Sequence, residues 1–414
     1  MSFEAHYSEY THPLVERINA AAQHCTLANG SLSFKSDTAR RDLIAAAEQL
    51  LMAARSPEET LFAIAQQPAQ NAALRCLMAP GILDALPLNG DPRSLDDLAH
   101  AVGAEKSLLA RILRACTSTS LLSETSELHY AHNTLSRTLL PPANRALLIL
   151  MYDYIGRGVF ALPEFLRARK WQDSGSYTDC SFMLGSNTTL PMWEYCEKDA
   201  VCNTTFDLGM QSEMVPALSA GKRGGNFPFD KELIVTNALD KAREDDITTI
   251  VDLGGGRGQV LQEIRKNHPE LAAAHFVLMD LGPVIENALA VGLPSWIKPV
   301  VGSFFEPFPI QGAHVYYLRR CLHNWDDVAC NTILLNVANA MDATRSRLLI
   351  TDMVVDNEGA ARGTAWEDLG MMAIGGIERT ERHWRTLLDE NGFRVHKIWR
   401  DDLGGHATID ARLK

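Results

Sequence analysis

The sequence predicts an α/β protein, with a doubly wound sheet that has an antiparallel C-terminal edge, preceded by an all-α part that ends in a winged helix. The sheet follows from short apolar runs that alternate with helical patterns from about residue 246 onward. The last two runs have no helix between them and share Gly404 and Gly405 as their turn, which predicts the antiparallel edge. The expected strands span 247–253, 275–280, 297–301, 313–318, 347–352, 393–399 and 405–413.

Residues 1–60 are expected to form an N-terminal helical arm. Apolar positions recur at helical spacing over 42–54, and the same pattern continues over 58–67. We expect this arm to pack against the rest of the protein or against a second copy of the chain.

A winged helix is expected over residues 61–145. The segment that starts at Ser94 has the order of a capping box, 106–116 is a second apolar-striped helix, and Gly103 separates the two helices. The following run, 121–140, has the size and turn content of a small β wing.

Composition and charge narrow the function classes. With 414 residues and 46% hydrophobic content, the chain is long enough for a large core and for two or more domains. The net charge of −12 argues against nucleic acid or an anionic membrane as a partner. The helix that would enter a DNA groove has only Lys106, Arg111 and Arg114 as basic residues. We therefore expect a small-molecule substrate.

The N-terminus and the cysteines indicate a compartment. The first residues, MSFEAHYSEYTHP, include acids and lack an apolar core segment, so no signal peptide is expected, and no transmembrane run is evident. Eight cysteines are present, but none forms a CxxC pair and none clusters with histidines. The sequence thus predicts reduced thiols, no metal site and a cytoplasmic location.

Residues 146–240 are expected to be a helical segment that lines a substrate pocket. Thioethers and aromatic rings adapt to flat ligands, so a set of them suits an apolar or aromatic substrate. Plain helical core is the alternative for each single residue. The side chains expected as pocket walls are Met183, Trp193, Phe206 and Met210, together with Met371 and Met372 further along the chain.

The most informative motif is the run VDLGGGRGQ, residues 251–259. An apolar strand ends there in a turn whose glycines at 254, 256 and 258 permit positive φ and a close approach of a ligand to the backbone. A helix candidate follows at once, so free N–H groups face a ligand at the carboxyl edge of the sheet. A dinucleotide motif would need its third glycine at the position of Gln259. The turn therefore predicts a nucleoside cofactor and disfavours NAD.

Two acidic residues refine this cofactor. Asp280 ends the next apolar run, roughly 20 residues past the glycines, where a carboxylate on ribose hydroxyls is expected; a helix cap is the alternative. Asp252, just inside the strand before the glycines, would lie beside a bound cation. A positively charged cofactor such as an adenosyl sulfonium fits this arrangement better than a polyphosphate.

The block HVYYLRRCLHNWDD, residues 314–327, resembles the small-molecule O-methyltransferases that use S-adenosyl-L-methionine, in the group that includes caffeic acid and many fungal enzymes. The resemblance extends to the winged helix, to MWEYCEKDAVCNTTFDLGM at 192–210, to the glycine turn and to ERTERHWRTLLDENGF at 378–393. It implies a winged-helix dimerisation domain, a homodimer, and a Rossmann-like domain over 241–414 that binds S-adenosyl-L-methionine.

The resemblance also implies the residues of the active site. His323 takes the place of the family's general base, which removes the proton of a substrate hydroxyl, and imidazole titrates near working pH. Asp352 and Glu378 take the places of two carboxylates that fix the tautomer and pose of that ring. A histidine that caps a helix beside Trp325 is the alternative. The cofactor residues carried over are Gly254 and Gly256 in the turn, Asp280 and Leu281 at the ribose, Ser303 and Phe304 at the adenine, and Arg319.

Three departures from the family pattern soften this expectation. Ser303 stands where an acidic residue usually binds the adenine amino group, and Asn324 stands where an aspartate commonly follows the base. A serine hydroxyl still accepts one hydrogen bond, so cofactor binding loses about 1 kcal/mol rather than the whole site. Asp352 stands in place of a glutamate and is shorter by one methylene, which puts its reach to the imidazole in doubt.

A second hypothesis follows from fungal proteins of the same fold, which resemble this chain as closely. These proteins keep bound S-adenosyl-L-methionine without transferring its methyl group and act as pericyclases or dehydratases. His132 then becomes a candidate acid or base, with a packed wing histidine as the alternative. Arg319, Arg320 and His323 would polarise the substrate, although a solvated strand-end arginine is the alternative for Arg319.

The function expected first is an S-adenosyl-L-methionine-dependent O-methyltransferase, with His323 as general base. Its substrate would be a hydroxyl of an aromatic or polyketide-derived secondary metabolite, and the pericyclase or dehydratase of fungal natural-product biosynthesis is the alternative. A winged-helix regulator with a vestigial cofactor domain is a third hypothesis, which the acidic charge and the His323 block disfavour.

Overall fold

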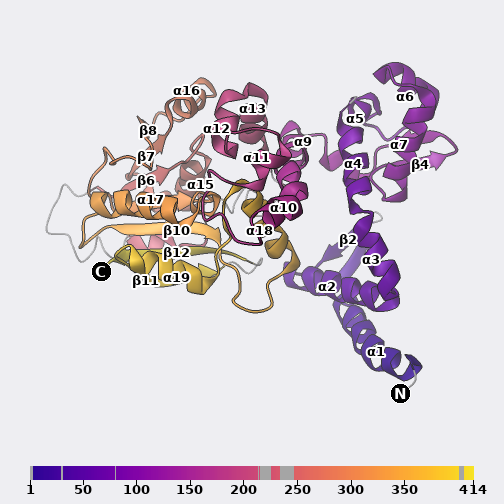
Figure 1. Ribbon diagram of the computed structural model, residues 1–414, viewed down its shortest axis with the longest axis horizontal. Coiled ribbons are helices and arrows are strands. Elements are labelled where there is room, and N and C mark those ends of the chain that lie inside the picture. The colour runs from indigo at the N-terminus through magenta and orange to yellow at the C-terminus, as the bar shows by residue number, and fades with distance from the viewer. Residues whose placement is uncertain are drawn as a thin grey trace. The chain divides into compact units, whose positions relative to one another are not determined.

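The computed structural model describes residues 3–28, 31–79, 81–212, 214, 225–233, 247–400 and 405–414. The chain divides into two compact units, Met1–Asn133 and Thr134–Lys414 (Figure 1). The first unit contains helices and two small sheets, and the second contains a helical segment and a larger sheet.

The N-terminal arm contains a hairpin that its helical pattern did not predict. Its elements are α1 (Phe3–Ala22), β1 (Cys25–Ala28), β2 (Ser31–Phe34), α2 (Asp37–Ala54) and α3 (Pro57–Ala65). Strands β1 and β2 pair antiparallel. The sequence between them is Asn29-Gly30, the pair most favoured in two-residue hairpin turns, and the helical periodicity on either side hid this signal. The expectation of an entirely helical arm is therefore wrong at this point.

The rest of the first unit has the expected helix-turn-helix and wing. Its elements are α4 (Gln67–Met78), α5 (Ile82–Ala85), β3 (Arg93–Ser94), α6 (Leu95–Val102), α7 (Lys106–Ser118), β4 (Ser123–Ser126) and β5 (His129–Ala131). Ser94 caps α6 by accepting a hydrogen bond from the N–H of Asp97, and Gly103 ends that helix with a φ of 65°. The wing strands pair in the order β3-β5-β4.

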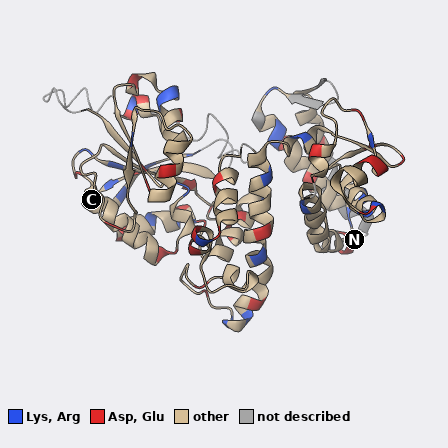
Figure 2. Cartoon of the chain, turned by 90° about the horizontal axis from the view of Figure 1, so that it is seen from above, with Lys and Arg blue, Asp and Glu red and all other residues tan. Residues whose placement is uncertain are grey.

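Charges of both signs are distributed over the helices (Figure 2). Lys106, the first residue of α7, forms an ion pair of 2.7 Å with Asp96 of α6. One of the few basic side chains on the helix that would enter a DNA groove therefore lies beside an acid.

The second unit begins with a helical segment. Its elements are α8 (Thr134–Thr138), α9 (Pro142–Ile149), the π-helix η1 (Leu150–Ile155), α10 (Gly156–Ala168), α11 (Ser181–Gly185), α12 (Met192–Lys198) and α13 (Ala200–Gly209). A disulfide joins Cys196 of α12 to Cys202 of α13. This pair corrects the expectation that all cysteines are reduced thiols. The corner between the two helices, at Asp199, brings together cysteines whose spacing matches no common motif.

One continuous helical stretch, Pro142–Ala168, is long and apolar enough to cross a membrane by length and composition alone. The sequence had indicated no transmembrane run, although charged residues such as Arg145, Asp153 and Arg157 lie within this stretch. A core helix of a globular protein passes the same test, and α10 packs against α11 here.

The larger sheet has its strands where the apolar runs predicted them. Its strands are β6 (Thr249–Leu253), β7 (His275–Asp280), β8 (Ile297–Val301), β9 (Val315–Arg319), β10 (Arg347–Met353), β11 (Phe393–Arg400) and β12 (His406–Leu413). Its helices are α15 (Gln259–Asn267), η2 (Pro269–Leu271), α16 (Gly282–Ala290), η3 (Leu322–Asn324), α17 (Asp327–Ala340), α18 (Arg362–Ile374) and α19 (Glu381–Glu390). Within the described residues, the strands pair in the order β11-β12-β10-β9-β6-β7-β8, which is a doubly wound arrangement.

The last two strands form the antiparallel edge that the sequence predicted, with β11 outermost and β12 between β11 and β10. β12 runs antiparallel to β10, with Ile409 opposite Ile350, and β11 pairs antiparallel with the other side of β12. β11 therefore forms the edge and runs in the direction of the parallel strands. The central residues of β12 are buried on both faces, whereas β11 has several exposed positions, so the strand with more to bury occupies the inner place. Of the two expected turn glycines, Gly405 has a φ of 92° and Gly404 lies outside the described residues.

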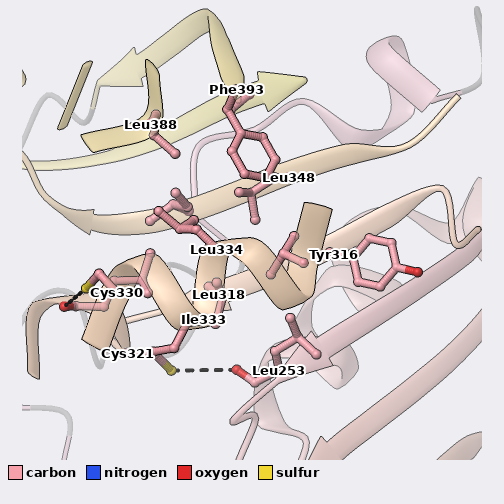
Figure 3. Packing of buried hydrophobic residues seen from close by; sticks show 14 of the residues in the cluster. Leu253, Tyr316, Leu318, Cys321, Cys330, Ile333, Leu334, Leu348, Leu388 and Phe393 are labelled. Carbon is pink, nitrogen blue, oxygen red and sulfur yellow. Dashed lines mark hydrogen bonds between the residues drawn. The ribbon is translucent and has the colours of Figure 1, made fainter. Parts of the chain in front are cut away.

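Two hydrophobic clusters cover the two faces of this sheet. Val251 and Leu253 of β6 pack in one cluster with Ile333 and Leu334 of α17 (Figure 3). Ile250, the residue before Val251, points to the opposite face and packs in the other cluster with α15 and α16, as strand alternation requires. β6 and β9 are adjacent and parallel, and their carboxyl ends therefore meet at the switch point where this fold places ligands.

Candidate active site

The glycine turn follows β6 in the conformation that its glycines predicted. Gly254, Gly256 and Gly258 have φ values of 72°, 61° and 74°, in the left-handed region that favours glycine. A Cβ on Gly254 would lie 3.1 Å from the Cys321 sulfur and 3.3 Å from the Phe304 ring. The turn is thus packed closely against two side chains from neighbouring strand ends.

Asp280 holds this turn through its carboxylate. Oδ2 accepts a hydrogen bond of 2.8 Å from the N–H of Gly256, and Oδ1 accepts one of 2.8 Å from the N–H of Leu281. Burial raises the pKa of Asp280, and the two N–H donors oppose that rise. Each carboxylate oxygen has a further lone pair, so the capping role and a contact with ribose hydroxyls are compatible.

The adenine-side residues lie beside the same turn. The Phe304 ring approaches Gly254, and Ser303 Oγ accepts a hydrogen bond of 3.2 Å from the N–H of Phe305. Gly302 donates to the carbonyl of Asp280 at 3.0 Å, which joins the ends of β7 and β8. The structure therefore brings the glycine turn, Asp280 and the Ser303 loop to one edge of the sheet.

Asp252 fits a positively charged ligand. Its side chain is buried, and among the described residues its Oδ2 has no hydrogen-bond partner. Burial raises the pKa of Asp252 to about 7, and the charge of Arg319 opposes this rise. A buried carboxylate oxygen without a partner is costly, and a cationic ligand at the turn would relieve that cost. The residues present at this edge therefore suit a nucleoside that bears positive charge.

His323 lies in η3, just after β9, and is buried. Its Nδ1 is 2.7 Å from Oε1 of Glu378, whereas Oδ1 of Asp352 is 3.8 Å away. Asp352 instead accepts a hydrogen bond of 3.3 Å from the backbone N–H of His323 through Oδ2. Of the two carboxylates expected to orient the ring, Glu378 therefore bonds it directly. The side chain of Asp352 is one methylene too short for that contact and holds the backbone of the turn.

Burial sets the protonation of this pair. It lowers the pKa of His323 to about 4 and raises the pKa of Glu378 to about 8. The two groups share one hydrogen bond, so their protons are coupled. His323 can accept a substrate proton at Nε2 only when Glu378 is a carboxylate that accepts a hydrogen bond from Nδ1–H.

Residues that sequence reasoning missed hold the segment of Glu378 against η3. The N–H of Ile377 donates to the carbonyl of His323 at 2.8 Å. Arg379 is fully buried and donates to the carbonyls of Leu322 and Trp325 at 3.0 and 2.8 Å. The available signal was an arginine directly after Glu378 in the same short motif.

All the expected pocket walls except Met372 belong to one cluster, in which aromatic rings reach the turn of His323. Trp193 and Phe206 contact edge to face at 5.3 Å, and Trp193 lies 6.1 Å from Trp325, with distances measured between ring centroids. Met183 and Met210 pack partly buried against the same helical core, where Met371 is buried. Met372, the next residue on α18, is 39% exposed. These residues thus form helical core, and the ring of Trp193 also lies near Trp325 beside His323. The packing is compatible with both alternatives, plain core and pocket wall.

An unexpected ion pair joins the pocket segment to the glycine turn. Arg257, between two of the turn glycines, pairs with Asp207 of α13, and Asn287 of α16 donates to the same carboxylate at 3.0 Å. The sequence offered no periodic signal for this contact, because its three members come from three separate segments.

His132 belongs to the first unit. It is buried, and its Nε2 lies 3.0 Å from the carbonyl oxygen of Leu83. This contact is the one expected of a packed wing histidine.

Two groups of described residues have ligand atoms close enough to hold a metal ion. They are Asp230, His268 and Glu270, and the base cluster of His323, Asp352 and Glu378. In the base cluster, Nδ1 and Oε1 are already joined by a hydrogen bond, which is the arrangement of an imidazole oriented by a carboxylate.

Family models match most of the chain. An O-methyltransferase dimerisation domain matches residues 64–142, and an O-methyltransferase domain matches residues 225–394. An O-methyltransferase of Pestalotiopsis microspora is 38% identical over 90% of this chain and 89% of its own length. The O-methyltransferase afvC of Aspergillus flavus is 31% identical over 97% of this chain and 96% of its own length.

Solved structures agree with these relatives. The crystal structure of OxaC has a TM-score of 0.85 and 29% identity, and covers 99% of this chain and 100% of its own. LepI in complex with SAM has a TM-score of 0.84 and 27% identity, and covers 98% of this chain and 100% of its own. A structure described as a pericyclic reaction enzyme has a TM-score of 0.84 at 26% identity. The chain therefore belongs to the family of S-adenosyl-L-methionine-dependent O-methyltransferases.

Proposed function

We propose that this protein transfers the methyl group of S-adenosyl-L-methionine to a hydroxyl of an aromatic or polyketide-derived secondary metabolite, with His323 as general base. The proposal rests on the buried hydrogen bond of 2.7 Å between His323 and Glu378, at a strand end adjacent to the glycine turn. OxaC, a structural relative, has been crystallised with SAH and oxaline, a small-molecule ligand, which supports a small molecule as the substrate.

In this proposal each group of residues has its own chemical role. When bound, the cofactor supplies an electrophilic methyl group. The glycine turn, Asp280 and Ser303 would hold its nucleoside, and Asp252 would face its positive charge. His323 would take the hydroxyl proton at Nε2 while Glu378 accepts the Nδ1 hydrogen bond, and this removal makes the oxygen a stronger nucleophile. The rings of Trp193, Phe206 and Trp325 would exclude water and hold a flat substrate.

The proposal includes a homodimer in the cytoplasm. The dimerisation domain over 64–142 supports the dimer. Light scattering of the purified protein tests the dimer, and a monomer at micromolar concentration would contradict it. Imaging of a fluorescent fusion in the host tests the location.

The decisive experiment supplies the protein with S-adenosyl-L-methionine labelled in its methyl group and an extract of phenolic and polyketide metabolites from the host. Methyl transfer produces a labelled product and an equal amount of S-adenosylhomocysteine. Calorimetric binding of the cofactor without either product would contradict methyl transfer.

A second candidate is a pericyclase or dehydratase that retains the cofactor as a bound cation. Two observations favour it: the similarity to the pericyclic reaction enzyme and the failure of Asp352 to reach the imidazole. Under this candidate, the same extract loses a metabolite while S-adenosylhomocysteine does not accumulate. The measurement that separates the two candidates is thus the ratio of S-adenosylhomocysteine formed to substrate consumed.

A further inference from the structure

Arg320 occupies a strained position between β9 and the turn of His323. Its φ is 48°, in the left-handed region that a residue with a side chain rarely adopts. Its backbone N–H donates to the carbonyl of Thr351 at 3.0 Å, and its own carbonyl accepts from Asn324 Nδ2 at 3.2 Å. Such a conformation persists only where the surrounding contacts fix it, and residues of this kind concentrate at functional sites.

The guanidinium of Arg320 is held from two other elements. Nη2 donates to Oε1 of Glu367 on α18 at 2.6 Å, and Nη1 donates to Nε2 of His406 on β12 at 3.0 Å. Because arginine has no acceptor, Nε2 of His406 must accept this hydrogen bond and cannot carry a proton. The side chain of Arg320 is 16% exposed, so its charge acts in a region from which water is largely excluded.

The carboxyl groups in and around the base cluster outnumber the arginines that face them. Carboxyl groups are contributed by Asp352 on β10, by Glu367 and Asp368 on α18, and by Glu378 in the loop after α18. Two arginines, Arg320 and Arg379, face this group of acids. The charge of Arg320 lowers the pKa of both His323 and Glu378, whereas the charge of Glu367 raises the pKa of both.

We propose that Arg320 and Glu367 act as an opposed pair of positioning residues that sets where the shared proton of His323 and Glu378 resides. Arg320 favours the form in which Glu378 is a carboxylate and Nε2 of His323 is free. Glu367 opposes that form through its charge and also fixes the guanidinium by its hydrogen bond.

Two forms of the pair differ by one proton. In the first, Glu378 is protonated and donates to Nδ1, so the neutral imidazole carries its proton on Nε2 and cannot act as a base. In the second, Glu378 is ionised and accepts from Nδ1–H, which leaves the Nε2 lone pair available. The second form arises when one proton is released to solvent, and the net charge of the pair changes from 0 to −1. A cation beside the pair stabilises the second form and an anion destabilises it.

The test is a direct titration of His323 by 15N NMR in the full-length protein saturated with S-adenosylhomocysteine. Histidine is 15N-labelled, and the His323→Gln variant assigns the resonances by difference. The nitrogen shifts report which ring nitrogen carries the proton, so the apparent pKa of the pair is measured without turnover.

Opposite shifts are expected from two neutralising substitutions. Arg320→Gln should raise the apparent pKa of the pair by about one pH unit, and Glu367→Gln should lower it by a similar amount. Arg320→Lys keeps the charge and should leave it within about 0.5 of the wild type. The matched control is Arg385→Gln, which breaks the exposed ion pair between Arg385 and Glu381 on α19 and should cause no shift.

Shifts in the same direction for Arg320→Gln and Glu367→Gln, or shifts no larger than that of the control, would overturn the inference. If Arg320→Gln does not fold, Glu367→Gln and Arg320→Lys decide it alone, since the first must lower the pKa and the second must preserve it. A merely structural role would reduce activity in all variants without opposite titration shifts.

The functional side of the inference rests on the proposed base role of His323. With a methyl acceptor in hand, the acid limb of kcat/KM should move with the NMR titration, to higher pH in Arg320→Gln and to lower pH in Glu367→Gln. If the acid limb of kcat/KM stays fixed while the NMR titration shifts, the inferred link between the proton position and the reaction rate is overturned. Full activity of His323→Gln defeats the base role, whereas the NMR shifts test the proton position independently.

Discussion

The two halves of the candidate active site are built on different principles. The cofactor edge consists of backbone groups in a glycine turn, and its main side chain, Asp280, bonds two backbone N–H groups. The base cluster consists of side chains, and the side chains of His323, Asp352 and Glu378 are no more than 4% exposed. One half would recognise a ligand through shape and dipoles, and the other depends on charges that are buried.

This difference predicts different tolerance to substitution. A backbone site loses affinity in modest steps when one side chain changes, because the N–H groups remain. A buried cluster of charges responds strongly, because each group sets the protonation of the others. The substitutions below probe this contrast in order of the expected effect.

The largest effect is expected from His323→Gln. Removal of the proposed general base should lower kcat/KM by about 10²–10⁴-fold, with the Kd of S-adenosylhomocysteine unchanged. Initial rates with labelled cofactor and calorimetry measure the two quantities. Loss of cofactor binding by the same factor would show that the halves are not separable.

The pH dependence of Glu378→Gln is expected to be qualitatively different from that of the wild type. Because burial raises the pKa of Glu378 to about 8, the base-competent form of the wild type accumulates only as the pH rises through that region. The amide cannot be ionised and still accepts from Nδ1–H, so its acid limb should move toward the lowered pKa of His323. We expect the plateau of the rate at high pH to be about 10-fold lower in Glu378→Gln than in the wild type, as measured from pH–rate profiles. An unchanged acid limb would exclude Glu378 from the titration.

Asp280→Asn tests the cofactor edge. An amide loses the charge of the carboxylate and one of its two acceptor oxygens, so the Kd of S-adenosylhomocysteine should rise by about 10–100-fold. At saturating cofactor, kcat should stay within about threefold of the wild type. A large fall in kcat with unchanged Kd would contradict the division between the halves.

Gly258→Ala should act on stability. Its φ of 74° is unfavourable for alanine, and the new Cβ would lie 3.0 Å from Leu293 Cδ1. We expect a loss of about 1–2 kcal/mol in the free energy of unfolding, measured by denaturant titration. Gly363→Ala, at a helical position where a Cβ meets nothing within 4 Å, is the control and should be neutral. Equal effects of both would refute the backbone argument.

The smallest effect is expected from Ser303→Asp. An acidic side chain at the adenine edge would add a charged acceptor, so the Kd of S-adenosylhomocysteine should fall by about fivefold, equivalent to ~1 kcal/mol. Ser303→Ala should raise it by no more than a similar factor. A weaker affinity with aspartate would mean that Ser303 does not face the adenine.

Local signals were sufficient for most of the fold. The apolar runs located the strands of the larger sheet, and the glycines located the turn, because strand alternation and positive φ leave marks in the nearest residues. The β1–β2 hairpin escaped because its Asn29-Gly30 signal lies between two longer helical patterns. The inner place of β12 escaped because pairing between distant strands depends on which faces remain to be buried.

The sequence by itself determined the sheet, the glycine turn, the acidic residue that ends β7 and the identity of the family. The tertiary structure decided which side chains contact one another in the site. It assigned Glu378 to the ring of His323 and Asp352 to its backbone, joined Asp207 to Arg257, and placed Arg320 between Glu367 and His406. These contacts join segments far apart in the chain, so no local pattern records them.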